Sequence, residues 1–489
     1  MPPRRRGNPV VVLVCLALTG AMILAVGWQW AASKAEAPDA ARPAVAAATS
    51  TPEVALATPV MSLRRAPGIL SRILNLDAFA QALQPLVNGL NDTSCVSVSV
   101  DGVPVVARNE TLPLIPASNM KLVVAAVALE VLGEDHRFST SVLGEVDAAG
   151  VVNGNLYLVG GGDPVLSTDW WVSSDVMTFP VINATRFEDL VRDVIAKGVR
   201  RVTGSIVGDA TRYDDELFAP SWDQEVRDNL EGGPYDALLV SDARTSLSAV
   251  AENPAEGAAQ LMTDMLRANG VTVVGEPVAG RTTSATELAT IESQPLPAIL
   301  DELLKTSDNN TTEMLVKEIG FIVRGDGSRE AGLSVIADTL DEWGIAMDDV
   351  VLADGSGLSN NNRITCATLL GVLQHGEVDD AVGEGLAVAG VSGTLEENFL
   401  GTEVAGRLRG KTGTLNNVSN TTPQSNPPAV RSLSGYVSIE GGGAIEFALI
   451  LNGQTITNKT EYEPIWYDLL APALGTYPSG AFVTDLMPR

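Results

Sequence analysis

A serine and a lysine stand three residues apart at the start of a long apolar run. They are Ser118 and Lys121 in "PASNMKL", which continues into "VVAAVALEVLG". Positions i and i+3 of a helix share a face, so the hydroxyl and the amine would lie within hydrogen-bonding reach. Burial beside the apolar run would lower the pKa of the lysine, as a general base requires. The pair predicts a serine nucleophile with a lysine base or, as the alternative, a helix-capping serine beside a solvated lysine.

Two further stretches favour the catalytic alternative. In "KTSDNNTTEMLVKEIG", Ser307 and Asn309 belong to a turn before an expected helix, and in "RGKTGTL", Lys411 and Thr412 occupy an expected strand. Taken alone, the first stretch fits a helix N-cap and the second fits a charged edge strand. In this order, however, S-x-x-K, S-D-N and K-T-G make up the active-site set of penicillin-interacting serine enzymes.

Beyond these motifs, the sequence resembles the low-molecular-mass penicillin-binding proteins of the type-4 class (class C), which are D-Ala-D-Ala carboxypeptidases and endopeptidases. Four more stretches look like signatures of that family: "LVGGGDPVLS", "GSIVGDATRYDD", "DGSGLSNNNRIT" and "VAGVSGTLEENF". The similarity extends from about Cys95 to Leu451. Class A β-lactamases share the three core motifs but lack the long insertion between the first two, so the insertion favours the peptidase family.

The resemblance implies a catalytic role for five residues. Ser118 would be the acylated nucleophile, and Lys121 would be the base that accepts its proton. Ser307 would pass that proton to the nitrogen of the departing D-alanine. Asn309 would hold the peptide amide of the substrate and help to position Lys121. Lys411 would bias the electrostatics of the cleft towards the terminal carboxylate of the substrate.

The resemblance also implies a set of substrate-binding positions. Thr412 would bind the terminal carboxylate through its hydroxyl, and Gly413 would let the substrate backbone lie against the strand. The backbone N–H groups of Ser118 and Thr414 would form the oxyanion hole, an element typically worth ~3 kcal/mol per donor. Asp163, in the "GGGD" signature, is a further expected substrate-binding residue.

The sequence departs from the family pattern in two places. The segment "TTPQSNPPAVR", residues 421–431, follows the K-T-G strand where the family usually turns directly into the next strand. This segment could cover the cleft or change which cross-link fits it. At Asn360 relatives often carry a basic residue, which leaves contacts to a substrate carboxylate at this position open.

The elements that must position these residues follow from the pattern of apolar residues. "CVSVSVDGVPVVARN" alternates around an Asp-Gly turn and predicts a hairpin, while "RLRGKTGTL", "SLSGYVSIE" and "AIEFALILNG" predict three antiparallel strands. The sequence therefore predicts an α+β, β-lactamase/transpeptidase-like domain, an antiparallel sheet with helices, assembled from both chain ends.

The long stretch between Lys121 and Ser307 cannot stay structureless in a compact domain, so it predicts an inserted unit. We expect this unit to be mainly β, because short apolar stretches there are separated by Gly and Asp turns. The expected boundaries are 67–141 and 292–489 for the transpeptidase-like domain and 142–291 for the insertion.

The N-terminal residues predict export. Residues 1–30 contain an arginine cluster, an almost wholly apolar run from Pro9 to Gly27, and two tryptophans. The run is long enough to span a bilayer, so we expect an uncleaved membrane anchor, with a cleaved signal peptide as the alternative. Residues 31–66, rich in Ala, Pro and Thr, predict a flexible linker.

Composition narrows the chemistry further. The formal net charge is −28 and the pI is about 4.4, which argues against a nucleic-acid partner. Only two histidines, His136 and His375, are present, which leaves little for a Ser-His-Asp triad or a histidine-rich metal site. The resemblance to the penicillin-binding proteins likewise implies that neither a metal nor an organic cofactor is required. In an exported chain Cys95 and Cys366 could form a disulfide, or they could remain two buried thiols.

These observations predict an extracytoplasmic serine D,D-peptidase that trims peptidoglycan stem peptides and is acylated by β-lactams. One alternative is a catalytically inactive wall-binding homologue, which the intact set of motif residues disfavours. Another is a serine β-lactamase, which the insertion disfavours, as does the lack of a recognisable deacylating-glutamate motif. The balance between carboxypeptidase and endopeptidase action and the oligomeric state do not follow from the sequence.

Overall fold

The computed structural model describes residues 68–175, 179, 181–416, 427–439 and 443–477. The expected anchor, the expected linker and most of the 421–431 segment lie outside these residues. Within the described part of the chain, no helix combines the length and the apolar character needed to cross a bilayer.

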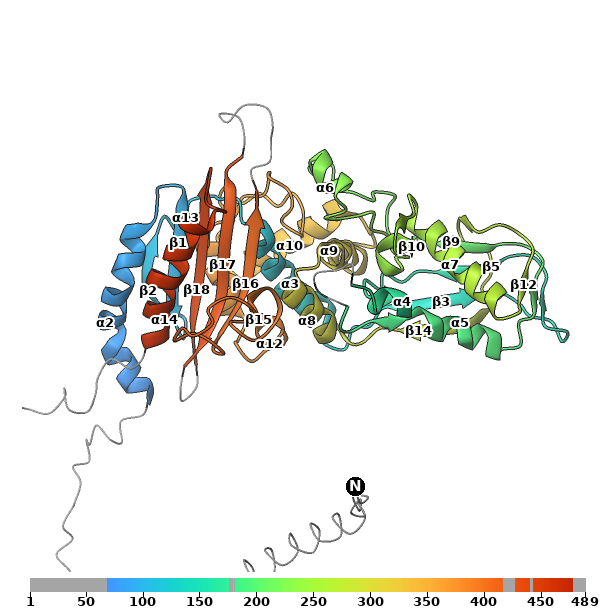
Figure 1. Ribbon diagram of the computed structural model, residues 1–489, viewed down its shortest axis with the longest axis horizontal. Helices are drawn as coiled ribbons and strands as arrows, with labels where there is room; N and C mark the ends of the chain where they lie inside the picture. The colour runs from blue at the N-terminus through green and yellow to red at the C-terminus, as the bar shows by residue number, and fades with distance from the viewer. Residues whose placement is uncertain (1–67, 176–178, 180, 417–426, 440–442, 478–489) are drawn as a thin grey trace, which may run out of the picture. The chain divides into compact units, whose positions relative to one another are not determined.

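A six-stranded antiparallel sheet is the centre of the part of the protein that both chain ends build, here called the main body (Figure 1). Its first and last strands in sequence are neighbours, because β1 pairs with β18. The expectation that both chain ends build one antiparallel sheet is therefore confirmed. In spatial order the strands are β15 (Ala387–Val388), β16 (Leu408–Leu415), β17 (Ala429–Ser438), β18 (Ala444–Gly453), β1 (Ser94–Val100) and β2 (Val103–Arg108).

The hairpin of β1 and β2 forms as the Asp-Gly signal predicts. Asp101 and Gly102 have φ angles of 48° and 77°, the left-handed conformation that a tight hairpin turn requires at both central residues. Successive side chains of β1 point to opposite faces of the sheet. Val96 and Val98 accordingly join one apolar core, and Cys95 joins the other.

Helices cover both faces of this sheet (Figure 1). On one face α2 (Gly68–Gly89), α13 (Lys459–Glu463) and α14 (Ala471–Thr476) close the first core around side chains such as Phe79 and Trp466. On the other face the second core is closed mainly by α3 (Met120–Leu132), α8 (Leu296–Thr306), α9 (Asn309–Arg324), α10 (Arg329–Glu342) and α11 (Cys366–His375).

A disulfide joins the sheet to this second layer of helices. Cys95 of β1 and Cys366 at the start of α11 are bonded in the structure, 271 positions apart in the sequence. The bond links the N-terminal and C-terminal parts of the main body, which the insertion separates in the sequence.

The inserted segment has its own sheets and core. Its five-stranded sheet has the spatial order β13-β9-β5-β3-β14. In the sequence the first of these strands is β3 (Ser139–Leu143) and the last is β14 (Glu287–Glu292). The other three strands of this sheet are β5 (Leu156–Val159), β9 (Ile206–Asp209) and β13 (Val278–Ala279), and β13 and β14 are its two edges. A separate three-stranded sheet has the order β12 (Thr272–Val273), β8 (Arg201–Val202) and β4 (Val151–Val152).

The expectation of a mainly β insertion is wrong. Two amphipathic helices, α5 (Phe187–Ala196) and α7 (Pro254–Ala268), share one apolar core with the strands. Strands β5 and β9 are parallel, and such a pair needs a crossover, which here contains α5. The short strands were visible in the sequence, but the share of helix between them was underestimated.

A second part of the insertion packs directly on the main body. Tyr213, Trp222 and Tyr235 form an apolar cluster with Met314 of α9 and Leu358. This contact brings the 213–240 stretch of the insertion beside the helix that begins at the S-D-N turn.

Candidate active site

Ser118 lies in a strained turn rather than at a helix cap. The turn is a short 3-10 helix, η2 (Ala117–Asn119), that runs directly into α3, and Ala117 has a φ of 50°. Such a conformation costs a non-glycine residue roughly 1–3 kcal/mol, and it persists only where the surroundings impose it. No side-chain cap is made at the start of η2 or α3. The alternative of a capping serine is therefore wrong.

Two serines of β17 hold this turn in place. Ser432 Oγ donates to the Pro116 carbonyl at 2.7 Å, and Asn119 Nδ2 donates to Ser434 Oγ at 2.9 Å. Both serines are fully buried, and they alternate on one face of the strand. The turn is thus anchored on each side of Ser118, and of its three residues only Ser118 is partly exposed.

Gly357 packs against the backbone of the Ser118 turn, and its replacement tests how strictly the turn is positioned. A Cβ on Gly357 would lie 2.0 Å from the Ala117 carbonyl oxygen, and the residue has a φ of +84°. We expect Gly357→Ala to displace Ser118 and lower the rate of acylation by a β-lactam roughly 10²-fold, since small misplacements have effects of that size.

Gly344→Ala is the matched control for this substitution. Gly344 has a φ of +73° with nothing within 4 Å of an added Cβ, so it carries the left-handed cost of ~1–2 kcal/mol without a clash. Stopped-flow acylation should separate the two variants. Equal rates for Gly357→Ala and Gly344→Ala would contradict a strictly positioned turn.

Lys121 is buried and makes three hydrogen bonds. Its Nζ lies 3.2 Å from Ser118 Oγ, 2.6 Å from Asn309 Oδ1 and 2.6 Å from the Ser356 carbonyl oxygen, and its exposed fraction is 0%. The alternative of a solvated surface lysine is therefore wrong as well. Burial lowers the pKa of Lys121 from 10.5 to about 8, although nearby carboxylates of Asp354, Asp308 and Glu313 oppose that change.

The S-D-N turn joins α8 to α9. Ser307 ends α8 in the left-handed conformation, with a φ of 65°, and Asp308 caps α9 by accepting the Thr311 N–H at 2.6 Å. The turn therefore serves both as a helix cap and as the point that directs Ser307 and Asn309 into the site. Asn309 Nδ2 donates to the Glu231 carbonyl at 2.5 Å, which fixes the amide from the side of the insertion.

The K-T-G strand lies against the Ser118 turn. Lys411 is fully buried, and its Nζ donates to Ser307 Oγ and to the Thr412 carbonyl, both at 2.9 Å. Burial lowers the pKa of Lys411 well below its ordinary value, and the charge of Lys121 lowers it further. The alternative of an exposed, protective edge lysine is wrong.

One edge of β16 is left for a ligand. Strand β15 pairs with β16 only at Arg409 and Gly410, so the described residues supply no strand partner on that side from Lys411 to Leu415. Gly413 faces the Ser118 turn, because a Cβ there would lie 3.0 Å from the Ser118 nitrogen. Thr412 Oγ1 and Thr394 Oγ1 are 2.9 Å apart at the same edge.

The structure brings the motif residues together and leaves Asp163 apart. Ser118, Lys121 and Asn309 form one hydrogen-bonded group, and Ser307 with Lys411 forms a second one beside it. Thr412 and Thr414 follow on the same strand, and both are accessible to a ligand.

Asp163 does not fit the expected role in substrate binding. Its side chain is 2% exposed, accepts the Val165 N–H at 3.0 Å, and has a pKa raised to about 6 by burial. A buried carboxylate that stabilises its own loop cannot contact a ligand in the cleft. In the structure, Asp163 of the "GGGD" signature therefore stabilises the loop that contains it.

Several residues at the site were not singled out from the sequence. Ser356 and Thr394 lie within the signatures "DGSGLSNNNRIT" and "VAGVSGTLEENF", which had pointed to the family without giving any residue a task. Ser432 and Ser434 had a weaker signal, their alternation in "SLSGYV" on a strand that is otherwise apolar. Asn360, where a basic residue was missing, donates through Nδ2 to Asp223 Oδ2 at 3.1 Å.

A cavity of about 420 Å³ adjoins the S-D-N turn on the side of the insertion. Its lining includes Ser307 and Asn309 from the turn and Trp171, Glu231 and Arg244 from the insertion. Groups of the insertion therefore form one wall of this cavity, and the S-D-N turn forms another. Across the described residues, no group of three or more His, Cys, Asp or Glu side chains is arranged to hold a metal ion.

A comparison with protein-family models decides the classification. The model of the D-Ala-D-Ala carboxypeptidase 3 (S13) family matches residues 74–254 and 241–465. The chain belongs to this family. It is a serine D,D-peptidase acting on peptidoglycan and, as an enzyme, a serine-type D-Ala-D-Ala carboxypeptidase.

Individual proteins agree with this assignment to the S13 peptidases. The D-alanyl-D-alanine carboxypeptidase of Actinomadura sp. strain R39 is 30% identical over 466 residues, covering 78% of this chain and 81% of that protein. Carboxypeptidase DacB of Mycolicibacterium smegmatis is 30% identical over 501 residues, covering 98% of this chain and 99% of that protein. The resemblance recognised in the sequence is therefore confirmed.

The fold of this S13 peptidase is shared with a solved structure. Penicillin-binding protein 4 (dacB) of Haemophilus influenzae superposes with a TM-score of 0.64 at 20% identity, covering 78% of this chain and 96% of that one. The mixed α+β architecture expected from the sequence is thus confirmed.

Proposed function

We propose that Ser118 is the nucleophile of this S13 peptidase and that Lys121 is the base that activates it. One observation carries the proposal: a serine hydroxyl 3.2 Å from a fully buried lysine amine whose other partners, Asn309 and Ser356, accept hydrogen bonds. A lysine amine with a lowered pKa can accept a proton near neutral pH, and this is the property that a general base needs.

In the proposed acylation, Ser118 Oγ attacks the carbonyl carbon between the last two D-alanines while its proton moves to Lys121 Nζ. The tetrahedral intermediate then expels the nitrogen of the terminal D-alanine, which must gain a proton to leave. Ser307 Oγ, which lies 2.9 Å from Lys411 Nζ, is proposed to deliver that proton and to take up in exchange the proton held by Lys121, which returns Lys121 to its neutral form. The products of this half-reaction are free D-alanine and an ester on Ser118.

Binding of the substrate is assigned to the open edge of β16. The terminal carboxylate would be bound by the Thr412 hydroxyl beside Lys411, whose charged form a carboxylate favours. The developing oxyanion would accept the backbone N–H groups of Ser118 and Thr414. Asn309 would hold the peptide amide, and Gly413 would leave room for the substrate backbone.

Deacylation completes the cycle with water as the second nucleophile. Lys121, again neutral, would accept a proton from water as the hydroxyl attacks the ester carbon, and the proton would return to Ser118 Oγ. This proposed cycle uses side chains, backbone N–H groups and water, and it conserves protons over both halves. A β-lactam would acylate Ser118 by the first half of the same sequence.

The remaining parts of the chain are assigned by proposal. We take residues 67–141 and 292–489 as the catalytic domain and residues 142–291 as the insertion that borders the cleft. Residues 1–30 are proposed to tether the protein to the plasma membrane on its extracytoplasmic side, with residues 31–66 as a linker. The stem peptides of peptidoglycan are the proposed substrates, and β-lactams the proposed covalent inhibitors.

The experiment that tests this function follows the products from defined peptides. A synthetic stem pentapeptide ending in D-Ala-D-Ala should lose one D-alanine, and prior treatment with penicillin should stop the release. A cross-linked muropeptide dimer assayed in parallel gives the balance of carboxypeptidase and endopeptidase action. Release that is insensitive to penicillin would contradict a shared acyl-enzyme, and absence of both products would favour the inactive wall-binding alternative.

A further inference from the structure

The carbonyl that contacts Lys121 belongs to a buried turn, and a side chain of α9 holds the residue that carries it. Ser356 donates its backbone N–H to Glu313 Oε1 at 2.7 Å, and Gly355 donates to the same oxygen at 3.0 Å. The Ser356 carbonyl in turn accepts the Lys121 amine at 2.6 Å. Glu313 is therefore one residue removed from the proposed base.

Glu313 lies on the same helix face as a direct partner of Lys121. Asn309 and Glu313 are four positions apart on α9, so their side chains point in the same direction. The first contacts the amine itself, and the second holds the carbonyl that contacts it. A single helix thus positions Lys121 through two separate hydrogen-bond routes.

The second oxygen of Glu313 is uncommitted. Glu313 has an exposed fraction of 0%, and its Oε2 has no hydrogen-bond partner among the residues that the structure describes. A buried carboxylate oxygen without a donor is costly in its charged form and is relieved when it binds a proton.

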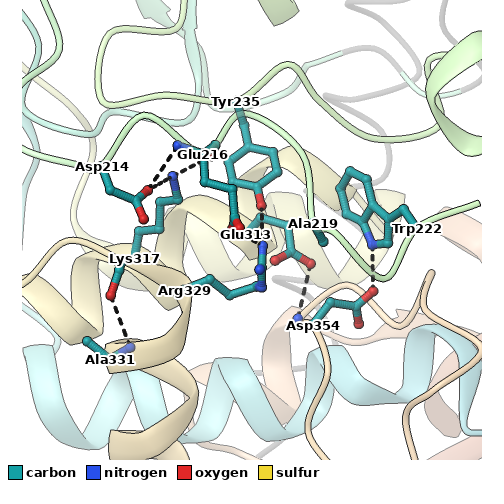
Figure 2. A network of polar contacts seen from close by, with 12 residues as sticks. Asp214, Glu216, Ala219, Trp222, Tyr235, Glu313, Lys317, Arg329, Ala331 and Asp354 are labelled. Atoms are coloured by element: carbon teal, nitrogen blue, oxygen red, sulfur yellow. Dashed lines mark hydrogen bonds and ion pairs between the residues drawn. The ribbon is translucent and has the colours of Figure 1, made fainter.

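The neighbouring carboxylate, Asp354, is in the opposite situation. Its Oδ1 accepts the Gly357 N–H at 2.9 Å, and its Oδ2 accepts the Ser359 N–H at 2.6 Å. Trp222 of the insertion adds its indole N–H to Oδ2 at 2.7 Å (Figure 2). Both oxygens of Asp354 therefore accept hydrogen bonds, whereas Oε2 of Glu313 accepts none from the described residues.

We propose that Glu313 is a positioning residue for Lys121, whose Oε1 fixes the Ser356 carbonyl against the amine and whose Oε2 gains or loses a proton beside it. This inference rests on the proposed role of Lys121 as the base. It adds that the affinity of the base for its proton is set by the charge of a residue that never contacts the substrate.

The charges around these two groups define the direction of the effect. Asp354, Arg329 of α10 and Tyr235 of the insertion face Glu313, and Figure 2 shows all three around it. Burial, followed by the charge of Asp354, raises the pKa of Glu313 to about 7.

The Lys121 amine, with a pKa of about 8, faces the carboxylates of Asp354, Asp308 and Glu313 and, across the cleft, Lys411. The titrations of Glu313 and Lys121 therefore overlap, and Glu313 gains its negative charge as the pH rises. The new negative charge then favours the protonated amine, so it delays activation of the base to higher pH.

Glu313→Gln tests the proposal, because glutamine keeps an Oε1 acceptor but is always neutral. We expect the rising limb of the acylation rate against pH to move to lower pH by roughly 0.5–1 unit, with the plateau at high pH nearly unchanged. Glu313→Ala removes the Oε1 acceptor as well, so its plateau should also fall by roughly tenfold or more.

Glu302→Gln is the matched control. Glu302 is a buried glutamate of α8 whose pKa is also raised to about 7, and it accepts the N–H groups of Ile182 and Asn183. It is not among the groups that shift the pKa of Lys121. Its limb should coincide with that of the wild-type protein.

A limb for Glu313→Gln that coincides with wild type, or that moves equally in Glu302→Gln, overturns the proposal. If the glutamine variant does not fold, ¹³C NMR of lysine-labelled wild-type protein decides the question. The Lys121 Cε signal should show a small step near pH 7 before its main titration near pH 8. A single step would reject the role of Glu313. If Lys121→Arg acylates normally, the proposed base itself has failed, which is a separate outcome.

Discussion

Replacing Lys121 by arginine is expected to lower the acylation rate roughly 10³-fold, within the range that general bases contribute. A guanidinium keeps its proton at every pH a protein tolerates, so it cannot accept one from Ser118. Because position 121 is fully buried and arginine is larger, Lys121→Met should be measured beside it. Both variants remove the base, and both should be slow. Stopped-flow acylation by a chromogenic β-lactam measures the rates.

The control for Lys121 is another lysine near the site. Lys305→Met removes an amine that pairs with Asp301 on the exposed side of α8, and it should acylate at the wild-type rate. Thermal melting followed by circular dichroism establishes that each variant is folded. An arginine variant that acylates as fast as wild type would mean that the Ser118 proton goes elsewhere.

The pH dependence of the wild-type rate belongs to the same prediction. The neutral amine is the active form, so the rate should rise with pH and reach half of its maximum near the pKa of Lys121. Burial has lowered that pKa to about 8, so the midpoint should lie near pH 8 instead of above pH 10.

Replacing Ser118 by alanine is expected to abolish both covalent labelling by penicillin and release of D-alanine. Ser307, the other serine of the motifs, is not expected to attack in its stead, since its Oγ is bound to Lys411. The substitution removes one hydrogen bond to Lys121, worth ~1 kcal/mol, so the fold should survive. Gel fluorescence with a labelled penicillin measures the first effect, and chromatography of the peptide products measures the second.

Ser328→Ala is the matched control for that loss. Ser328 caps α10 by accepting the Ala331 N–H at 3.2 Å, so its removal costs ~1 kcal/mol of stability without touching the cleft. Labelling of this variant should equal that of wild type. Undiminished labelling of Ser118→Ala would exclude it as the nucleophile.

The catalytic motifs could be predicted from the sequence because each is short and fixed by local geometry. Ser118 and Lys121 are joined by helical spacing, and Ser307 by a turn that also caps a helix. The β1–β2 hairpin and the three C-terminal strands followed from alternation and turn residues. In these cases the information lies within a few neighbouring residues.

What could not be predicted depends on contacts between distant segments. Ser356 reaches Lys121 across 235 positions, and Ser434 reaches Asn119 across 315, so no local pattern marks either of them. The parallel pairing of β5 and β9 and its helical crossover depend on the tertiary fold in the same way. Asp163 was misassigned because a residue of a family signature was taken for a substrate-binding one, whereas its side chain is buried within its own loop.

The proposed role of Ser118 is tested most directly by locating the residue that a β-lactam acylates. Wild-type protein treated with benzylpenicillin, digested and analysed by tandem mass spectrometry should carry one penicilloyl group, located on Ser118. The peptides that contain Ser307 and Ser356 should remain unmodified. A penicilloyl group on any residue other than Ser118, or no covalent adduct on a folded protein, would contradict the account.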